Sequence, residues 1–497
     1  MKKGMICHRG LLYAAAAAFV TLMICSKSSP LYPLNDWVDA NTYLTVGRGM
    51  LHGKLPYRDL YEHKGPLLYM LHAAAAAVSR ESFLGVFIIE LIACTAFLYE
   101  AKVLLGGKQR IWLLPLIAGA VYASKAFCHG DSAEELCLPL TLGAYMIGLK
   151  TVRGENTLDG RKWFLLGILG GAVFWVKYTF TGVISAAAGA GIFAAVRSGK
   201  AATLVQGISL CVLGGAAASL PVIVYFGVNG AISDLFSVYF YDNLFRYTEP
   251  DGSFFNHLTD GLNFCRLFMT VPFILVCTGL MILALRGEYA MLAYYSASLV
   301  LMILSVFGGH SSFQYYPLAM AAFVPQSVCA IADAAEKYST KLSFSRRTEA
   351  VLAAVSIVIC GAWCFGTSRN VYLMKCGRDE LPQYRFADMI EENGGGRLLN
   401  YGFIDGGFYL TAGQVPEFRY FCLNNMDNPE MAAAQDYYVS RGMADFVVTR
   451  SSEPVSEFSF PGYVLIGREE MCYYDKKFYY FLFKNAENGA NNLSAIE

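Results

Sequence analysis

The sequence predicts a mainly α-helical membrane protein that crosses the bilayer many times and carries a small α/β domain near its C-terminal end. Of the 497 residues, 55% are hydrophobic and only 16% are charged, whereas an ordinary soluble chain has about 25% charged residues. Apolar stretches of about 20 residues, the length that crosses a bilayer, recur up to residue 368. After about residue 375 the composition changes to shorter, more polar segments.

About eleven transmembrane helices are expected from the apolar stretches. The first follows a basic segment and lacks the small residues of a cleavage site, so we expect an uncleaved helix that starts in the cytoplasm. Residues 66–79 are apolar but too short for a full span, which favours a re-entrant or interfacial helix. The expected spans are 10–27, 83–105, 110–128, 133–150, 161–178, 179–196, 203–226, 264–285, 287–308, 315–335 and 348–368.

The basic residues predict the orientation of these helices. Every second connection between the expected spans holds Lys or Arg residues, which is the pattern of cytoplasmic loops. Counting 66–79 as a span would place the same bases outside. We therefore expect a membrane domain at 1–374, whose first outer loop is 28–82, and an extracytoplasmic α/β domain at 375–497, with the whole protein integral to the plasma membrane.

The C-terminal segment shows alternating helix and strand patterns. The stretch QYRFADMIEENGGG is typical of a helix that glycines end, and EMAAAQDYYVSRG of a second helix. Four short runs predict strands, namely RLLNYG, FRYFCL, ADFVVT and YYFLFK. The last residues, NAENGANNLSAIE, are expected to be disordered.

Composition also excludes some functions. The net charge is zero and no basic tract with interleaved aromatic residues is present, so we expect no nucleic-acid partner. The 14 cysteines are scattered, mostly inside apolar segments and without a CxxC pair, so we interpret them as small packed hydrophobes.

Residues 36–66 form the most polar segment in the first half of the chain. Asp39 precedes apolar residues at helical spacing, which predicts a short helix lying on the membrane. The Asp39 carboxylate is therefore either a helix cap or a catalytic group. Glu62 is either a second catalytic carboxylate or a surface group paired with Lys64 or Arg58.

Several bases lie on the face that the topology predicts to be poor in Lys and Arg. Arg58 and Lys64 lie in the first outer loop, and Lys177 lies in a tight apolar turn, where an unpaired charge is costly. An anionic ligand at the interface, most simply a phosphate, would explain all three. The alternatives are snorkelling and ion pairing with the loop carboxylates.

Two further outer segments carry polar groups. HGDSAEE, at 129–135, contains Asp131 and Glu134, which favour a helix N-terminus through the dipole or bind a divalent metal. GGHSSFQYYP, at 308–317, places His310 and Gln314 in an outer loop, where they are either substrate contacts or incidental polar residues.

The first outer loop resembles that of the family 39-type glycosyltransferases. These membrane enzymes of the GT-C fold are related to protein O-mannosyltransferases and aminoarabinose–lipid A transferases. The resemblance lies in Asp39 with Tyr43 four residues on, and in the acidic-x-Lys-x-Pro pattern at Glu62, Lys64 and Pro66. SAEELCLPL is similar to the second acidic loop of the family, so Asp131 or Glu134 would be its carboxylate.

This sequence departs from many relatives at Ala40, where they have a second acidic residue after the first. Asp36 would then take the place of that carboxylate and contact the substrate, or a metal would be absent. No sugar or acceptor follows from the residues, and a divalent metal remains an open expectation.

The resemblance implies sugar transfer from a polyprenyl-phosphate donor to a glycan, lipid or protein acceptor at the outer face of the bilayer. Asp39 would take the proton from the acceptor hydroxyl, and Glu62 would orient the acceptor or a metal. Arg58, Lys64 and Lys177 would hold the donor phosphate. The main alternative is a transporter or lipid flippase, which would need ionisable residues near the bilayer midplane.

Overall fold

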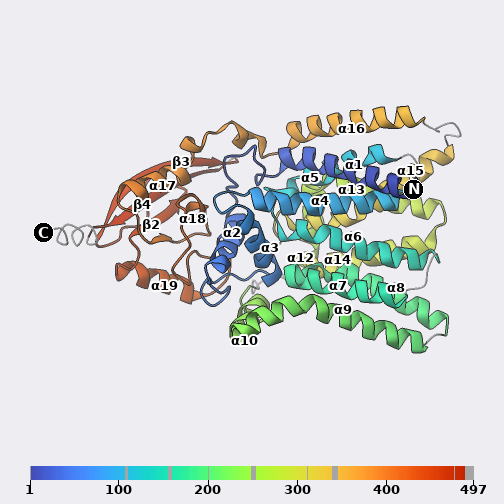
Figure 1. Ribbon diagram of the computed structural model, residues 1–497, viewed down its shortest axis with the longest axis horizontal. Coiled ribbons are helices and arrows are strands. Elements are labelled where there is room, and N and C mark those ends of the chain that lie inside the picture. Colours follow the sequence, from blue (N-terminus) through green and yellow to red (C-terminus); the bar gives the residue numbers. More distant parts are fainter. Residues whose placement is uncertain are drawn as a thin grey trace. The chain divides into compact units, whose positions relative to one another are not determined.

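The computed structural model of the protein describes residues 2–106, 110–154, 159–199, 201–247, 253–309, 312–338, 345–474 and 476–486. It is mainly helical and carries a small sheet near the C-terminus, as the sequence predicts (Figure 1). The chain folds into two compact units. Unit 1 comprises Met1–Ser26, Phe87–Tyr225 and Thr248–Val371, and unit 2 comprises Lys27–Val86, Phe226–Tyr247 and Tyr372–Glu497.

Unit 1 is a helical bundle. Helix α6 packs against α7 and α8, α14 packs against α8, and α1 packs against α5 and α16. The helices are α1 (Lys2–Cys25), α4 (Leu84–Leu105), α5 (Leu114–Tyr122), α6 (Ala133–Val152), α7 (Gly160–Lys177), α8 (Gly182–Arg197), α9 (Ala201–Val228), α12 (Phe254–Phe268), α13 (Thr270–Leu285), α14 (Tyr289–Phe307), α15 (Val324–Tyr338) and α16 (Arg346–Thr367), with the 3-10 helix η5 (Tyr316–Phe323) before α15.

The described residues do not confirm eleven spans. By length and composition, six helical segments can cross a membrane, or up to seven if a bent pair counts as one. The expected span 110–128 is interrupted, since α5 covers only Leu114–Tyr122. The expected span 133–150 forms α6, whose first turn carries Glu134 and Glu135.

Two breaks shape the bundle. Lys177 has an extended backbone between α7 and α8, and a Cβ on Gly170 would meet Ile184 at 3.0 Å, so the two helices fold back on one another. The expected span 264–285 is wrong as one straight helix, because α12 and α13 meet at Met269 with a bend of 106°. Polar side chains on one side of α12 suit a helix that lies along an interface.

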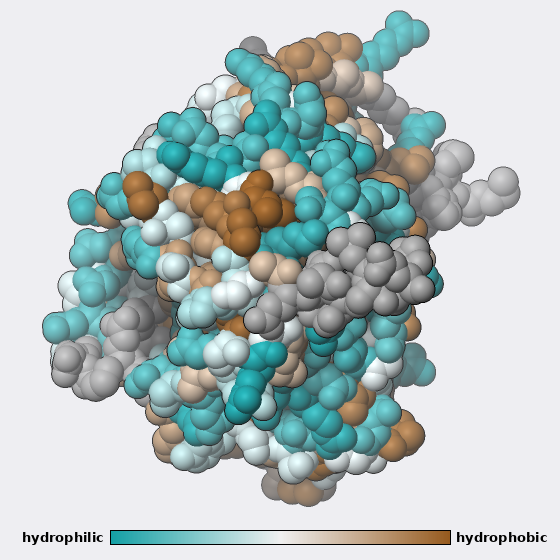
Figure 2. Space-filling model, turned by 90° about the vertical axis from the view of Figure 1, so that its left-hand side faces the viewer, coloured by the Kyte–Doolittle hydropathy of each residue, from teal (hydrophilic) through white to brown (hydrophobic). Residues whose placement is uncertain are grey.

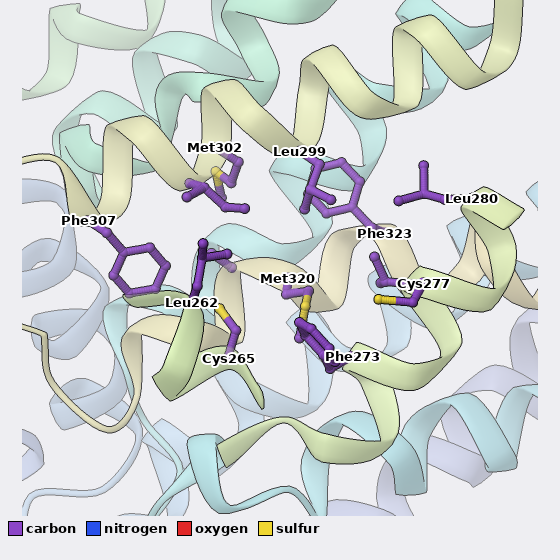
Figure 3. Close-up of a pocket in the computed structure, with 13 residues that line it drawn as sticks. Leu262, Cys265, Phe273, Cys277, Leu280, Leu299, Met302, Phe307, Met320 and Phe323 are labelled. Atoms are coloured by element: carbon purple, nitrogen blue, oxygen red, sulfur yellow. The ribbon is translucent and has the colours of Figure 1, made fainter. Parts of the chain in front are cut away.

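An apolar cavity of about 80 Å³ lies among α12, α13, α14 and η5 (Figure 3). Leu262 and Cys265 from α12, Met302 from α14 and Phe323 from η5 point toward it. Residues on both sides of the bend at Met269 line it, Cys265 from α12 and Phe273 from α13.

Unit 2 contains a four-stranded sheet with the order β1-β2-β4-β3. Its strands are β1 (Leu398–Asn400), β2 (Phe446–Ser451), β3 (Tyr463–Tyr473) and β4 (Lys476–Asn485). β1 and β2 are parallel, whereas β2–β4 and β4–β3 are antiparallel. The predicted strand FRYFCL is wrong, since its Phe418 and Tyr420 lie in an irregular segment, and β3 was not predicted.

The helices of unit 2 include two that the sequence predicted in the C-terminal segment. They are α17 (Pro382–Glu392), which left-handed Gly394 and Gly395 follow, and α19 (Pro429–Ser440). The others are α2 (Val38–Leu51), α3 (Pro66–Val78), α10 (Ile232–Leu235), the π-helix η4 (Phe236–Asp242), α11 (Asn243–Phe245) and α18 (Phe408–Thr411). The expected disordered tail, 485–497, is wrong at its first residue, because Asn485 ends β4, and its residues from 487 lie outside the described residues.

The first outer loop folds together with the C-terminal segment in unit 2. The Thr45 hydroxyl donates to Asp405 Oδ2 at 2.6 Å, and Arg48 Nη1 donates to the Tyr409 carbonyl at 3.2 Å. The Tyr61 backbone N–H donates to the Arg419 carbonyl at 2.8 Å.

The face of the molecule on the side of β2, β3 and β4 is largely hydrophilic, with small apolar groups (Figure 2).

Candidate active site

Helices α2 and α3 form a tight pair in the first outer loop. A Cβ on Gly47 would lie 2.5 Å from the backbone carbonyl carbon of His72, so only glycine permits this approach. The Tyr43 and His72 rings meet edge to face, with centroids 5.5 Å apart. Pro66 begins α3 at a position where its missing N–H costs nothing. The pairing fixes the polar residues at the adjacent ends of both helices.

Asp39 lies in the first turn of α2, one residue beyond the helix start, and is half-buried. The cap position belongs to Trp37, which makes no side-chain cap bond. The Tyr43 hydroxyl donates to Asp39 Oδ2 at 3.4 Å, which fits the one-turn spacing of the two residues. Asp39 is therefore not the N-cap, and its catalytic role stays a prediction.

Glu62 is buried at the start of α3. Its Oε2 accepts hydrogen bonds from the Tyr69 hydroxyl and, at 2.9 Å, from the Lys64 backbone N–H. Burial and the Glu62 carboxylate raise the pKa of Tyr69, and the nearby Tyr43 adds to this shift. Asp39, Tyr43, Tyr69 and Glu62 thus form a run of neighbouring polar groups, which we call the carboxylate–tyrosine chain. It links the two carboxylates that the sequence nominated.

Lys64 lies at the end of this chain and is half-buried. Its Nζ lies 3.1 Å from His63 Nε2 and 5.9 Å from the centroid of the Tyr247 ring. Arg58 is placed differently, because its guanidinium pairs with Asp234 at 2.7 Å and donates to the backbone carbonyl of Asn229. Of the two first-loop bases that the sequence nominated, Lys64 is thus the one beside Glu62.

In unit 1, two other nominated residues meet. Lys177 Nζ forms an ion pair with Glu134, and its ammonium lies 3.9 Å from the centroid of the Tyr316 ring. The Glu134 side chain is 1% exposed and that of Lys177 is 13% exposed. The cost of a charge in this apolar turn is therefore offset by a carboxylate and an aromatic face.

Asp131 precedes α6 with a left-handed backbone, φ 63°. Its N–H donates to Glu90 Oε1 at 2.9 Å and to Glu135 Oε2 at 3.1 Å, and all three residues are buried. The Ser132 hydroxyl caps α6 by accepting from the Glu135 N–H. Sequence reasoning missed Glu90, although a lone Glu in the first half of the apolar stretch 83–105 was a visible signal.

The remaining nominated residues lie elsewhere. Asp36 is buried in an ion pair with Lys27 at 2.6 Å. Tyr372 donates to Asp36, and burial together with that carboxylate raises the pKa of Tyr372. Gln314 donates to the Lys125 carbonyl at 2.8 Å. His310 lies outside the described residues.

The described side chains bear on metal binding and on disulfides. In the described ranges, no three His, Cys, Asp or Glu side chains are grouped so that they would hold a metal ion. The described cysteines form no disulfide, although the Sγ atoms of Cys360 and Cys364 in α16 lie 3.8 Å apart.

Comparisons with known proteins add little to this geometry. No known family and no curated protein matches the sequence. Among solved structures, the chain is similar to the arabinofuranosyltransferase AftD from mycobacteria, with 13% identity and a TM-score of 0.44. The match covers 96% of this chain but only 40% of AftD. A likeness at this level carries no argument about fold or activity, so the proposals below depend on this chain's own residues.

Proposed function

We propose that the protein is a membrane glycosyltransferase that transfers a sugar from a polyprenyl-phosphate donor to an acceptor at the extracytoplasmic face. The carboxylate–tyrosine chain is the observation that carries the proposal. It joins a half-buried carboxylate in the first turn of α2, Asp39, to a buried one just before α3, Glu62, and the Lys64 backbone N–H donates to Glu62. A lipid carrier is the expected donor, because nucleotide sugars are not available outside the cytoplasm.

In the proposed reaction, the acceptor oxygen attacks the anomeric carbon while the bond from that carbon to the donor phosphate breaks. Asp39 takes the proton that the acceptor hydroxyl loses. Lys64 stabilises the negative charge of the departing lipid phosphate. A single displacement of this kind inverts the anomeric centre.

The environment of each carboxylate supports this assignment. Glu62 is buried and already accepts two hydrogen bonds, so we assign it to orienting its neighbours. Asp39 is less buried, and the bond that it accepts from the Tyr43 hydroxyl is long, at 3.4 Å.

Asp39→Asn tests the assignment. Asn keeps the size of the side chain but cannot accept a proton at neutral pH, so transfer should fall about 100-fold or more. The assay measures sugar transfer from a pool of polyprenyl-phosphate sugars, with thermal stability checked in parallel. Asp59→Asn is the matched control and should leave transfer unchanged, because Asp59 Oδ2 accepts from the Leu55 N–H at 2.7 Å within its own turn. Full transfer by a folded Asp39→Asn variant would refute the role of Asp39.

A transporter or flippase is the second candidate, and one observation favours it. Helix α4 contains two carboxylates, Glu90 and Glu100, and Glu90 is fully buried. Ionisable residues inside a membrane helix are typical of transport pathways. Wild-type protein that transfers no sugar from the donor pool, but moves lipid-linked sugars across vesicle membranes in a Glu90-dependent way, would establish this alternative.

A further inference from the structure

His63 lies between the two charged residues of the motif Glu62-His63-Lys64. Its ring is buried, with Nδ1 3.2 Å from Glu62 Oε1 and Nε2 3.1 Å from Lys64 Nζ. The Tyr247 ring packs against the imidazole, with centroids 4.9 Å apart. On the backbone side, Asn243 Nδ2 donates to the His63 carbonyl at 2.6 Å. Neighbours along the chain and residues of the segment 243–247 thus fix this histidine within unit 2.

These contacts assign the protonation of the ring. A lysine ammonium only donates hydrogen bonds, so Nε2 must be the acceptor, and the ring proton then lies on Nδ1 beside the Glu62 carboxylate. Neutral His63 is therefore the acceptor that fixes the direction of the Lys64 head group. A protonated ring has no acceptor and carries a charge that repels the ammonium.

We propose that His63 is a positioning residue that holds the Lys64 ammonium in place for the phosphate of the lipid donor. The proposal rests on the proposed function, in which Lys64 meets that phosphate. A flexible lysine loses side-chain entropy when it binds, and an acceptor that fixes it beforehand lowers this cost. Glu62 acts one step further away, because its carboxylate lies 3.2 Å from Nδ1 and favours a ring proton on that nitrogen.

The proposal predicts weaker phosphate binding at acidic pH. In the described part of unit 2, the titratable groups that face the His63 ring include Glu62, Lys64 and Tyr247, with Tyr69 bonded to Glu62. As pH falls, protonation of His63 removes the acceptor and places a second positive charge beside Lys64. Binding of a phosphate should therefore weaken as pH falls in the wild type, and less so in a variant without the imidazole.

The test uses the full-length protein in detergent and farnesyl phosphate as the probe, with farnesol as the control for the lipid tail. His63→Phe keeps a ring against Tyr247 but removes the acceptor, and should raise the Kd for farnesyl phosphate about tenfold. His63→Gln places a carbonyl oxygen near the position of Nε2, and should keep the Kd within about threefold. Farnesol binding should be unchanged in both variants.

Lys64→Met separates this proposal from the proposed function. It should raise the Kd at least as much as His63→Phe, and adding His63→Phe to it should change little, because the two residues act as one unit. An unchanged Kd in Lys64→Met overturns the phosphate role of Lys64 and this inference together. A raised Kd in Lys64→Met with an unchanged Kd in His63→Phe overturns the inference alone.

The pH dependence of the Kd distinguishes a positioning role of His63 from a merely structural one. Between pH 7.5 and 5.5, the Kd should rise more in the wild type than in His63→Gln. The titration of the probe itself affects both proteins equally. Equal weakening in His63→Phe and His63→Gln, with the same loss of thermal stability, would show that His63 only packs the loop.

Discussion

At the scale of single residues, the Glu134–Lys177 pair gives a prediction about stability. Lys177→Met leaves a buried carboxylate without its counter-charge, which typically costs about 3–5 kcal/mol. The double variant Glu134→Gln/Lys177→Met removes both charges and should recover most of the loss. Thermal unfolding of the two single variants and the double variant measures this coupling. Additive losses would show that the ion pair contributes little.

The buried Asp405 carboxylate predicts that the stability of the protein depends on pH. Burial raises the pKa of Asp405 to about 6, although bonds from Thr45 and Gly407 and the charge of Arg48 act in the opposite direction. The folded state therefore favours the protonated acid. The stability that this preference contributes is complete below pH 3.8, the ordinary pKa, and is lost as pH rises through 6.

Asp405→Asn removes this titration and keeps an oxygen for the Gly407 N–H. Between pH 4 and pH 7.5, the free energy of unfolding of the wild type should fall relative to that of the variant by roughly 1–3 kcal/mol. Melting curves at several pH values measure the difference. A constant difference across that range would show that Asp405 titrates alike in the folded and unfolded states.

At the scale of elements, the α2–α3 pair depends on Gly47. The Cβ of Gly47→Ala would lie 2.5 Å from the His72 backbone, so the helices must separate. We expect a loss of about 1–3 kcal/mol in stability and reduced transfer. Gly189→Ala in α8 is the matched control, because nothing lies within 4 Å of its Cβ position. There alanine should be neutral or slightly stabilising. Equal effects of the two substitutions would contradict close packing at Gly47.

At the scale of the whole molecule, the expected orientation remains to be tested. Cys472 is exposed in β3, so it can serve as the single reactive cysteine after the other cysteines are replaced. A membrane-impermeant maleimide should label it in intact cells. Ser198→Cys, placed in a predicted inner connection, should react only after permeabilisation. The opposite labelling pattern would reverse the predicted topology.

The sequence by itself determined the elements that depend on local pattern. Apolar runs predicted most helices of unit 1, the spacing after Asp39 predicted α2, and the turn at Lys177 was placed correctly. Hydropathy and helical period are properties of neighbouring residues, so they can be read without the fold. The same pattern could not predict the bend at Met269, because α12 and α13 are both apolar enough to continue one another.

Only the tertiary structure decided which charged groups meet. It joined Lys177 to Glu134, enclosed Asp36 with Lys27, and brought Thr45 to Asp405 across 360 positions. It also grouped 27–86 with the C-terminal segment in one unit. A buried charge is stable only beside a partner, and the chain supplies that partner from wherever the packing of helices brings two segments together. The spacing of residues along the sequence does not show which distant segments pack together. The contacts of the nominated residues could therefore be learned only from the fold.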